Sequence, residues 1–89
     1  MNYEIIKNLI DNNRYNEALA KLDILIAQNP NDDEAYYIKG KVYQRLSQWG
    51  NAIKTYNKAI ELNPESKAVT ALDMLYDILK SINNNIIST

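Results

Sequence analysis

The sequence contains no cysteine and no histidine, and its 89 residues include only two glycines and two prolines. Without cysteine, the chain has no disulfide, no thiolate zinc site and no cysteine nucleophile. Without histidine, it lacks the commonest general base, the commonest zinc ligand and the usual switch at physiological pH. Two glycines are too few for a phosphate-binding loop or a dinucleotide-binding fingerprint. We therefore expect no enzymatic activity, no catalytic residues, and no metal or cofactor site.

Charge and hydropathy exclude further classes of protein. Ten Lys and Arg side chains against eleven Asp and Glu give a net charge of −1, whereas a nucleic-acid-binding domain usually carries a basic patch. No apolar stretch approaches the roughly 18 residues that a membrane span requires. The N-terminal segment contains Glu4 and Asp11 and no cleavage site of a signal peptide. The sequence therefore predicts a cytoplasmic protein that binds neither nucleic acid nor membranes.

The chain repeats itself at an interval of 34 residues. Displacing the sequence by that interval aligns Asn29-Pro30 with Asn63-Pro64 and Ala18 with Ala52. Identical residues also align elsewhere, namely Ile26 with Ile60, Tyr3 with Tyr37, and Lys7 with Lys41. Because the matches combine turn residues with apolar ones, they indicate an internal structural repeat, which is the signature of a solenoid.

Each period carries the signals of two helices joined by short turns. Apolar residues at steps of three and four predict helices over residues 3–11, 15–28 and 32–46, a fourth from Trp49 to the turn before Pro64, and a fifth over 66–82. The run Asn31-Asp32-Asp33-Glu34 fits a helix start, because it offers an N-cap followed by acidic residues. A calcium loop would need alternating acids and a central glycine, so we do not interpret this run as a metal site. Residues 83–89 have no cap and no continuing period, and we expect them to fray.

The period and its small and aromatic positions resemble the tetratricopeptide repeat family, whose unit is 34 residues of paired antiparallel helices. The positions that carry the resemblance in the second unit are Tyr36, Gly40, Tyr43, Ala52, Tyr56 and Pro64. Lys39 departs from the pattern, since the family usually has leucine there. The resemblance implies one all-α domain over residues 1–82, a right-handed helical-repeat solenoid. Its five helices would form two helix-turn-helix units, over about 2–31 and 32–65, and a closing helix over about 66–82.

The resemblance also implies a function, because tetratricopeptide repeats bind a peptide or a partner protein in a concave groove lined by the first helix of each unit. The residues that it assigns to the groove here are Tyr3, Lys7, Ile10, Tyr37, Lys41, Gln44, Arg45, Leu75 and Ile78. Their aromatic, aliphatic and cationic character suits an acidic or amphipathic segment, either an extended peptide or a helix. The subgroup that clamps chaperone C-terminal tails uses Lys, Asn and Arg at five places, which here hold Tyr3, Lys7, Ile38, Ala68 and Leu72. Chaperone tails are therefore not the expected partner.

Two groups of charged residues, the cations of the second unit and a pair of aspartates in the last helix, could be either functional residues or ordinary solvent-exposed surface. The cations of the second unit are Lys39, Lys41, Arg45, Lys54 and Lys58. They form either a solvated face balanced by nearby acids or the anchors for an acidic peptide. Asp73 and Asp77 lie four residues apart on the polar stripe of the last helix, which is typical of a solvent-exposed face rather than of a catalytic pair.

The closing helix has an unusually wide apolar face for a terminal helix. A capping helix normally presents polar side chains to water on its outer side, whereas here the polar residues occupy one narrow stripe. Apolar surface left without a following helix favours association with another protein surface. The alternative function is therefore that of a structural homo-oligomeriser, which forms a homodimer through Leu72, Leu75, Tyr76 and Leu79.

Overall fold

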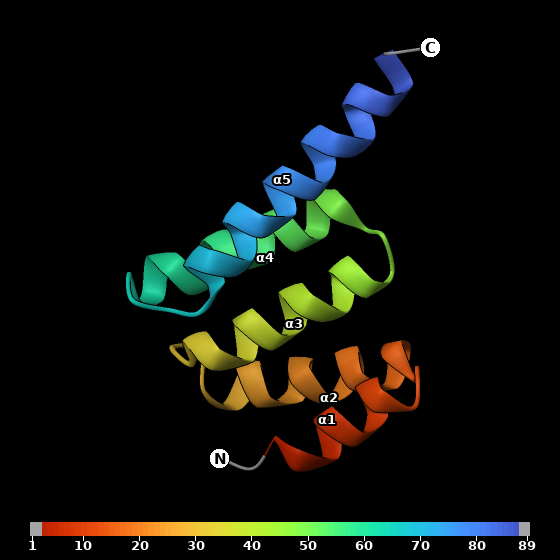
Figure 1. The fold of residues 1–89 in the computed structure, drawn as a ribbon. Helices are drawn as coiled ribbons and strands as arrows, with labels where there is room; N and C mark the ends of the chain where they lie inside the picture. The colour runs from red at the N-terminus through yellow and green to blue at the C-terminus, as the bar shows by residue number, and fades with distance from the viewer. Residues whose placement is uncertain (1–2, 88–89) are drawn as a thin grey trace.

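The computed structural model describes the backbone of residues 3–87 and the side chains of residues 3–83. Within that range the chain forms five α-helices and no β-strand (Figure 1). The helices are α1 (Glu4–Asp11), α2 (Tyr15–Gln28), α3 (Asp33–Arg45), α4 (Trp49–Leu62) and α5 (Ala68–Ile87). This arrangement confirms the all-α helical-repeat fold that the 34-residue period predicts.

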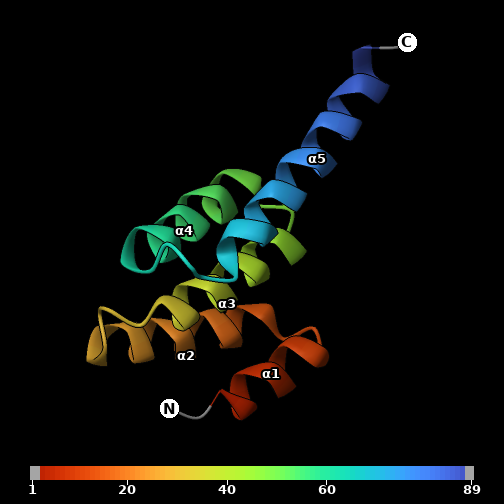
Figure 2. The ribbon, with the colours of Figure 1, turned by 60° about the vertical axis from the view of Figure 1, so that its left-hand side comes forward.

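The helices are stacked in chain order, so that each packs on its neighbours in the sequence. α1 packs on α2, α2 on α3, α3 on α4, and α4 on α5. In Figure 1, α1 lies in front of α2 and α5 lies in front of α4, with α3 between the two pairs. Figure 2 shows the same order from another side, with the end of α5 projecting beyond α4. The result is an elongated body with principal extents of 47 × 30 × 16 Å.

The turns within the two units have the same backbone structure, one period apart. Asn13 and Ser47 both have positive φ, at 60° and 57°, which places them in the left-handed region. In the first turn the Arg14 N–H donates to the Leu9 carbonyl at 2.8 Å, and the corresponding bond in the second turn is 2.9 Å. Such six-to-one bonds close a helix in the manner of a Schellman motif. The repeat seen in the sequence is therefore also a repeat of backbone geometry.

Side chains determine where α3 and α5 begin. Oδ1 of Asp32 accepts hydrogen bonds from the backbone N–H groups of Glu34 and Ala35, at 3.1 and 3.3 Å, so Asp32 is the N-cap of α3. This confirms the helix start predicted over residues 31–34. Oγ of Ser66 accepts a hydrogen bond from the Ala68 N–H at 3.1 Å, and α5 accordingly begins at Ala68, two residues after its predicted start.

The end of α5 differs from the prediction. The helix continues to Ile87 rather than ending at Ile82, because no proline or glycine follows Ile82 to interrupt the backbone hydrogen bonds. Within the tail that was expected to fray, residues 83–87 are thus helical. Residues 88–89 lie outside the described part of the chain.

Two apolar clusters form the core, one in each half of the stack. The first joins α1, α2 and α3 through Ile6, Ala18, Leu22, Ala35, Ile38 and Val42. The second joins α4 and α5 through Ala52, Tyr56, Ala59, Ala68, Leu72 and Leu75. Tyr37 packs against both clusters. This tyrosine therefore connects the two halves at the centre of the molecule.

Candidate functional site

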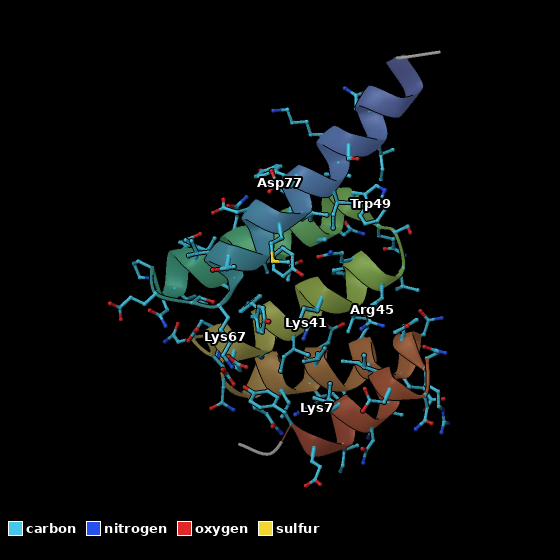
Figure 3. All side chains as sticks on the ribbon, viewed as in Figure 1. Lys7, Lys41, Arg45, Trp49, Lys67 and Asp77 are labelled. Atoms are coloured by element: carbon cyan, nitrogen blue, oxygen red, sulfur yellow. The ribbon has the colours of Figure 1, made fainter. Side chains whose placement is uncertain are left out.

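A groove of about 780 Å³ lies between α1 and α3, with Lys67, just before α5, at one edge. Six of the nine residues that the sequence assigns to a groove line it: Tyr3, Lys7, Ile10, Tyr37, Lys41 and Arg45. Figure 3 shows Lys7 on α1 and both Lys41 and Arg45 on α3 at this face. Tyr37, Lys41 and Arg45 follow one another at four-residue steps, which is why they share one face of α3.

The α3 side of the groove carries positive charge. Within the described part of the chain, Lys7, Lys41 and Arg45 form no ion pair. Nζ of Lys41 lies 5.3 Å from the centre of the Tyr37 ring, and Nζ of Lys67 lies 6.0 Å from the same centre. Both cations are thus within cation–π range of one aromatic ring.

Carboxylates line other parts of the same groove. Glu34 pairs with Lys67 at 3.5 Å, and Glu4 and Asp11 line the α1 side together with Lys7. The α1 side therefore has mixed charge. Beyond its first turn, α3 contributes only cationic and uncharged residues to the groove, so Lys41 and Arg45 carry the excess positive charge.

A hydrogen bond between Tyr3 and Asp32 ties the two sides of the groove together. The Tyr3 hydroxyl donates to Oδ2 of Asp32, while Oδ1 of the same carboxylate caps α3. Burial and the Asp32 carboxylate raise the pKa of Tyr3 above its ordinary value, so the hydroxyl keeps its proton and remains a donor. The residue that precedes α1 is thereby anchored at the start of α3.

The groove continues from α3 toward α5 as a second, smaller hollow of about 180 Å³. Its lining includes Gln44 and Ile78, two more of the predicted groove residues, and it shares Tyr37, Lys41 and Arg45 with the larger part. The sequence prediction did not include Lys67 or Met74, although both line the groove. Met74 lies four residues before Ile78 and shares its face of α5, but Leu75, three residues before Ile78, meets the one-turn spacing equally well.

Leu75 does not line the groove, contrary to the sequence-based assignment. It is fully buried against α4 in the second core cluster. The neighbouring residue Met74 points instead toward the groove, where it lines the smaller hollow with Ile78. Consecutive helical residues are turned by about 100° from each other, so one position separates a core residue from a groove residue.

The residues predicted for self-association are also placed differently from that prediction. Leu72 and Leu75 are 8% and 0% exposed within this chain, and Leu79 is half-buried against the same cluster. Of the four, only Tyr76 is exposed, at 48%. These leucines serve the packing of α5 on α4, so a second copy of the chain would meet other apolar side chains of α5.

The five cations of the second unit do not form a single patch. Lys39, Lys54 and Lys58 line a separate hollow of about 510 Å³ between α3 and α4, away from Lys41 and Arg45. Nζ of Lys39 pairs with Asp23 at 2.8 Å, and Nζ of Lys58 lies 3.7 Å from Glu61. This second hollow therefore fits the interpretation as a charge-balanced surface better than the groove does.

Two other kinds of site, a metal centre and a membrane span, have no counterpart among the described residues. No group of three or more carboxylates in that part of the chain is arranged to hold a metal ion. No helix there combines the length and the apolar character needed to cross a membrane.

Comparison with known proteins identifies the family. The family model described as tetratricopeptide repeat matches residues 3–67, which is more than half of the chain. The chain therefore belongs to the tetratricopeptide repeat family. No curated protein matches the sequence significantly.

Solved structures agree with this assignment. The solution NMR structure of Bacteroides fragilis protein BF1650 is similar over 94% of this chain and 86% of its own, with 39% identity and a TM-score of 0.85. A solution NMR structure of a tetratricopeptide repeat domain protein from Salinibacter ruber matches 85% of this chain and 77% of its own, at 30% identity and a TM-score of 0.65. A crystal structure of a tetratricopeptide repeat domain protein from the same organism matches 84% of each chain, at 31% identity and a TM-score of 0.63.

Proposed function

We propose that this protein is an interaction module of the cytoplasm that binds an acidic or amphipathic segment of a partner protein in the groove along α1, α3 and α5. Tetratricopeptide repeat proteins generally mediate protein–protein interactions, and a non-enzymatic role agrees with the absence of cysteine and histidine. The observation that supports an acidic partner is the pair Lys41 and Arg45, which line the groove without an ion pair to any described residue.

The groove combines an aromatic surface with positive charge, two features that bind a short acidic segment of a protein. Tyr37 presents a half-buried aromatic ring between two cations, and aromatic and arginine side chains are enriched among the residues that dominate binding energy. Exposed cations such as Lys41 mainly increase the association rate and select the charge of the partner. A nucleic acid is disfavoured, because the whole chain has a net charge of −1.

The test reverses the charge of the groove and measures the binding of an acidic peptide. The double variant Lys41→Glu and Arg45→Glu should weaken binding about a hundredfold, since each reversal removes an attraction and adds a repulsion worth about 1.4 kcal/mol or more. The matched control is Lys54→Glu with Lys58→Glu, which changes the net charge equally but lies in the other hollow. Equal weakening by both double variants would mean that the groove is not the binding site.

A second candidate function is self-association through α5. Among the described residues, the large apolar side chains most exposed on this helix are Val69, Met74, Tyr76, Ile78 and Ile82, whereas the rest of the chain has only Ile5 and Ile24. Repeat arrays usually need about three units to bury their apolar faces, and a symmetric dimer is the commonest closed assembly. Val69 and Tyr76 are seven residues apart on one face of α5, and neither lines the groove. A second copy packed on that face would leave the groove free.

Sedimentation equilibrium tests this candidate directly. The apparent mass should rise with protein concentration, and Val69→Glu with Tyr76→Glu should return it to the monomer value. A constant monomer mass up to concentrations on the order of 100 µM would exclude all but very weak association.

A further inference from the structure

The part of the groove between α3 and α5 differs in chemistry from the part between α1 and α3. The smaller hollow is lined by two cations, Lys41 and Arg45, and by no carboxylate. Its opposite side is apolar and is formed by Ala71, Met74 and Ile78 of α5. Met74 and Ile78 are 59% and 40% exposed, so this apolar side is available to a partner.

The two sides of this hollow form two parallel rows. Lys41 and Arg45 are one helical turn apart on α3, and Met74 and Ile78 are one turn apart on α5, which separates the members of each pair by about 6 Å along the helix. Figures 1 and 2 show that α3 and α5 run in the same general direction. A cationic row therefore lies beside an apolar row, both following the length of the groove.

The size of the hollow limits what can enter it. About 180 Å³ is only slightly more than the roughly 150 Å³ of an engineered cavity that holds one benzene. A partner helix, about 10–12 Å across with its side chains, is too wide to sink into it. The backbone of a partner must therefore lie above the hollow and direct side chains down to both rows.

We infer that this part of the groove binds an acidic amphipathic helix of the partner protein, an inference that rests on the proposed binding of an acidic segment. Residues at i and i+4 of a helix have the spacing of both rows, and one helix face presents two neighbouring lines of side chains. Carboxylates on one line then meet Lys41 and Arg45, and aliphatic side chains on the other meet Met74 and Ile78. An extended strand directs only every second side chain downward, in a single line, and serves one row at a time.

Two peptides of identical composition and about 15 residues test this inference, since shorter helices are marginal in water. The first repeats Glu and Leu at helical spacing, so that each forms its own stripe, and the second alternates Glu and Leu at strand spacing. Fluorescence anisotropy with labelled peptides measures affinity, and circular dichroism of the mixture measures the helix gained on binding. We expect the helical-phase peptide to bind at least about tenfold more tightly and to gain helix in the complex.

Variants of the protein locate the contact on α5. Ile78→Ala should weaken binding of the helical-phase peptide about tenfold, because it removes part of the apolar row without changing charge. The matched control is Tyr76→Ala, which truncates another exposed apolar side chain of α5 on its other flank. Both side chains are exposed, so both variants should fold, and their helix content is checked by circular dichroism.

The outcomes separate this inference from the function on which it rests. The inference is wrong if both peptides bind equally, or the strand-phase peptide binds better, while Lys41→Glu with Arg45→Glu still weakens binding. It is also wrong if Ile78→Ala and Tyr76→Ala behave alike. If neither peptide binds at concentrations on the order of 100 µM, the proposed acidic partner fails together with it.

Discussion

Gly40 of α3 lies so close to Tyr56 of α4 that a β-carbon added to the glycine would be 2.5 Å from both Cδ1 and Cε1 of the ring. The ring cannot easily move aside, because Tyr56 is 1% exposed and its hydroxyl donates to Oε1 of Gln44 at 2.8 Å. No glycine in the described chain has positive φ. Gly40 is therefore required by the close approach of the two helices rather than by its own backbone conformation.

We predict that Gly40→Ala lowers the free energy of unfolding by about 1–3 kcal/mol, as overpacking of a core contact does. That figure is the net change, because the clash outweighs the roughly 1 kcal/mol that alanine gains over glycine in a helix. Gly50 is the matched control, because it is also helical and an added β-carbon would have no neighbour within 4 Å. Gly50→Ala should leave stability unchanged or raise it by up to about 1 kcal/mol. Urea denaturation of the two variants measures both values, and equal stabilities would contradict the proposed clash.

Tyr56 also makes the free energy of unfolding depend on pH in the alkaline range. Burial, with a smaller contribution from Tyr37, raises the pKa of Tyr56 from 10.0 to about 12. The folded protein therefore holds this proton more tightly than the unfolded chain does, and the resulting stabilisation is complete below about pH 10 and lost as the pH rises through 12. We predict that the free energy of unfolding falls over this range more steeply in the wild type than in Tyr56→Phe. Denaturant titrations at a series of alkaline pH values give the two slopes, and parallel slopes would refute the prediction.

Tyr3 and Asp32 offer a test of how α1 is held on α3. Tyr3→Phe removes the hydroxyl that donates to Asp32, and we predict a loss of about 1–2 kcal/mol in the free energy of unfolding, since the acceptor is charged and half-buried. Asp32→Ala also removes the N-cap of α3 and should cost more, about 2–3 kcal/mol. Thermal denaturation ranks the variants, with Tyr15→Phe as the control, because the Tyr15 hydroxyl donates only to an exposed neighbour, Asn13. A Tyr3→Phe variant as stable as the control would show that this hydrogen bond contributes little.

Most of the fold could be predicted because its signals are local and repeated. The two Asn-Pro pairs, one period apart, each end a helix, and Asp32 begins one. The end of α5 was predicted less well, since residues 83–87 contain no residue that either stops or favours a helix strongly. Two features have no local signal in the sequence: the hydrogen bond from Tyr3 to Asp32, and the position of Lys67 at the edge of the groove. Both depend on how distant segments pack.

The groove could be predicted where polar and apolar residues alternate clearly along a helix. On α3, the resemblance assigns Tyr37, Lys41 and Arg45 to the groove, and their four-residue steps keep all three on one face of the helix. On α5, apolar residues occupy most of the helix surface outside one polar stripe, and the pattern does not show which of Met74 and Leu75 faces α4. Tertiary packing decides this rotation, and the sequence-based assignment was wrong there by one residue.

Substitution of these two neighbours tests the rotation of α5 that the groove requires. Leu75 is 0% exposed and Met74 is 59% exposed, so Leu75→Ala should lower the free energy of unfolding by about 2–5 kcal/mol, the usual cost of a core cavity. Met74→Ala should change it by no more than about 0.5 kcal/mol, as for other surface positions. Urea denaturation compares the two losses. Peptide binding should show the opposite ranking: Met74→Ala should bind the peptide more weakly, whereas the folded fraction of Leu75→Ala should bind it as the wild type does. If Met74→Ala were the more destabilising change, α5 would be rotated about its axis, and its apolar row would face α4 instead of the cations of α3.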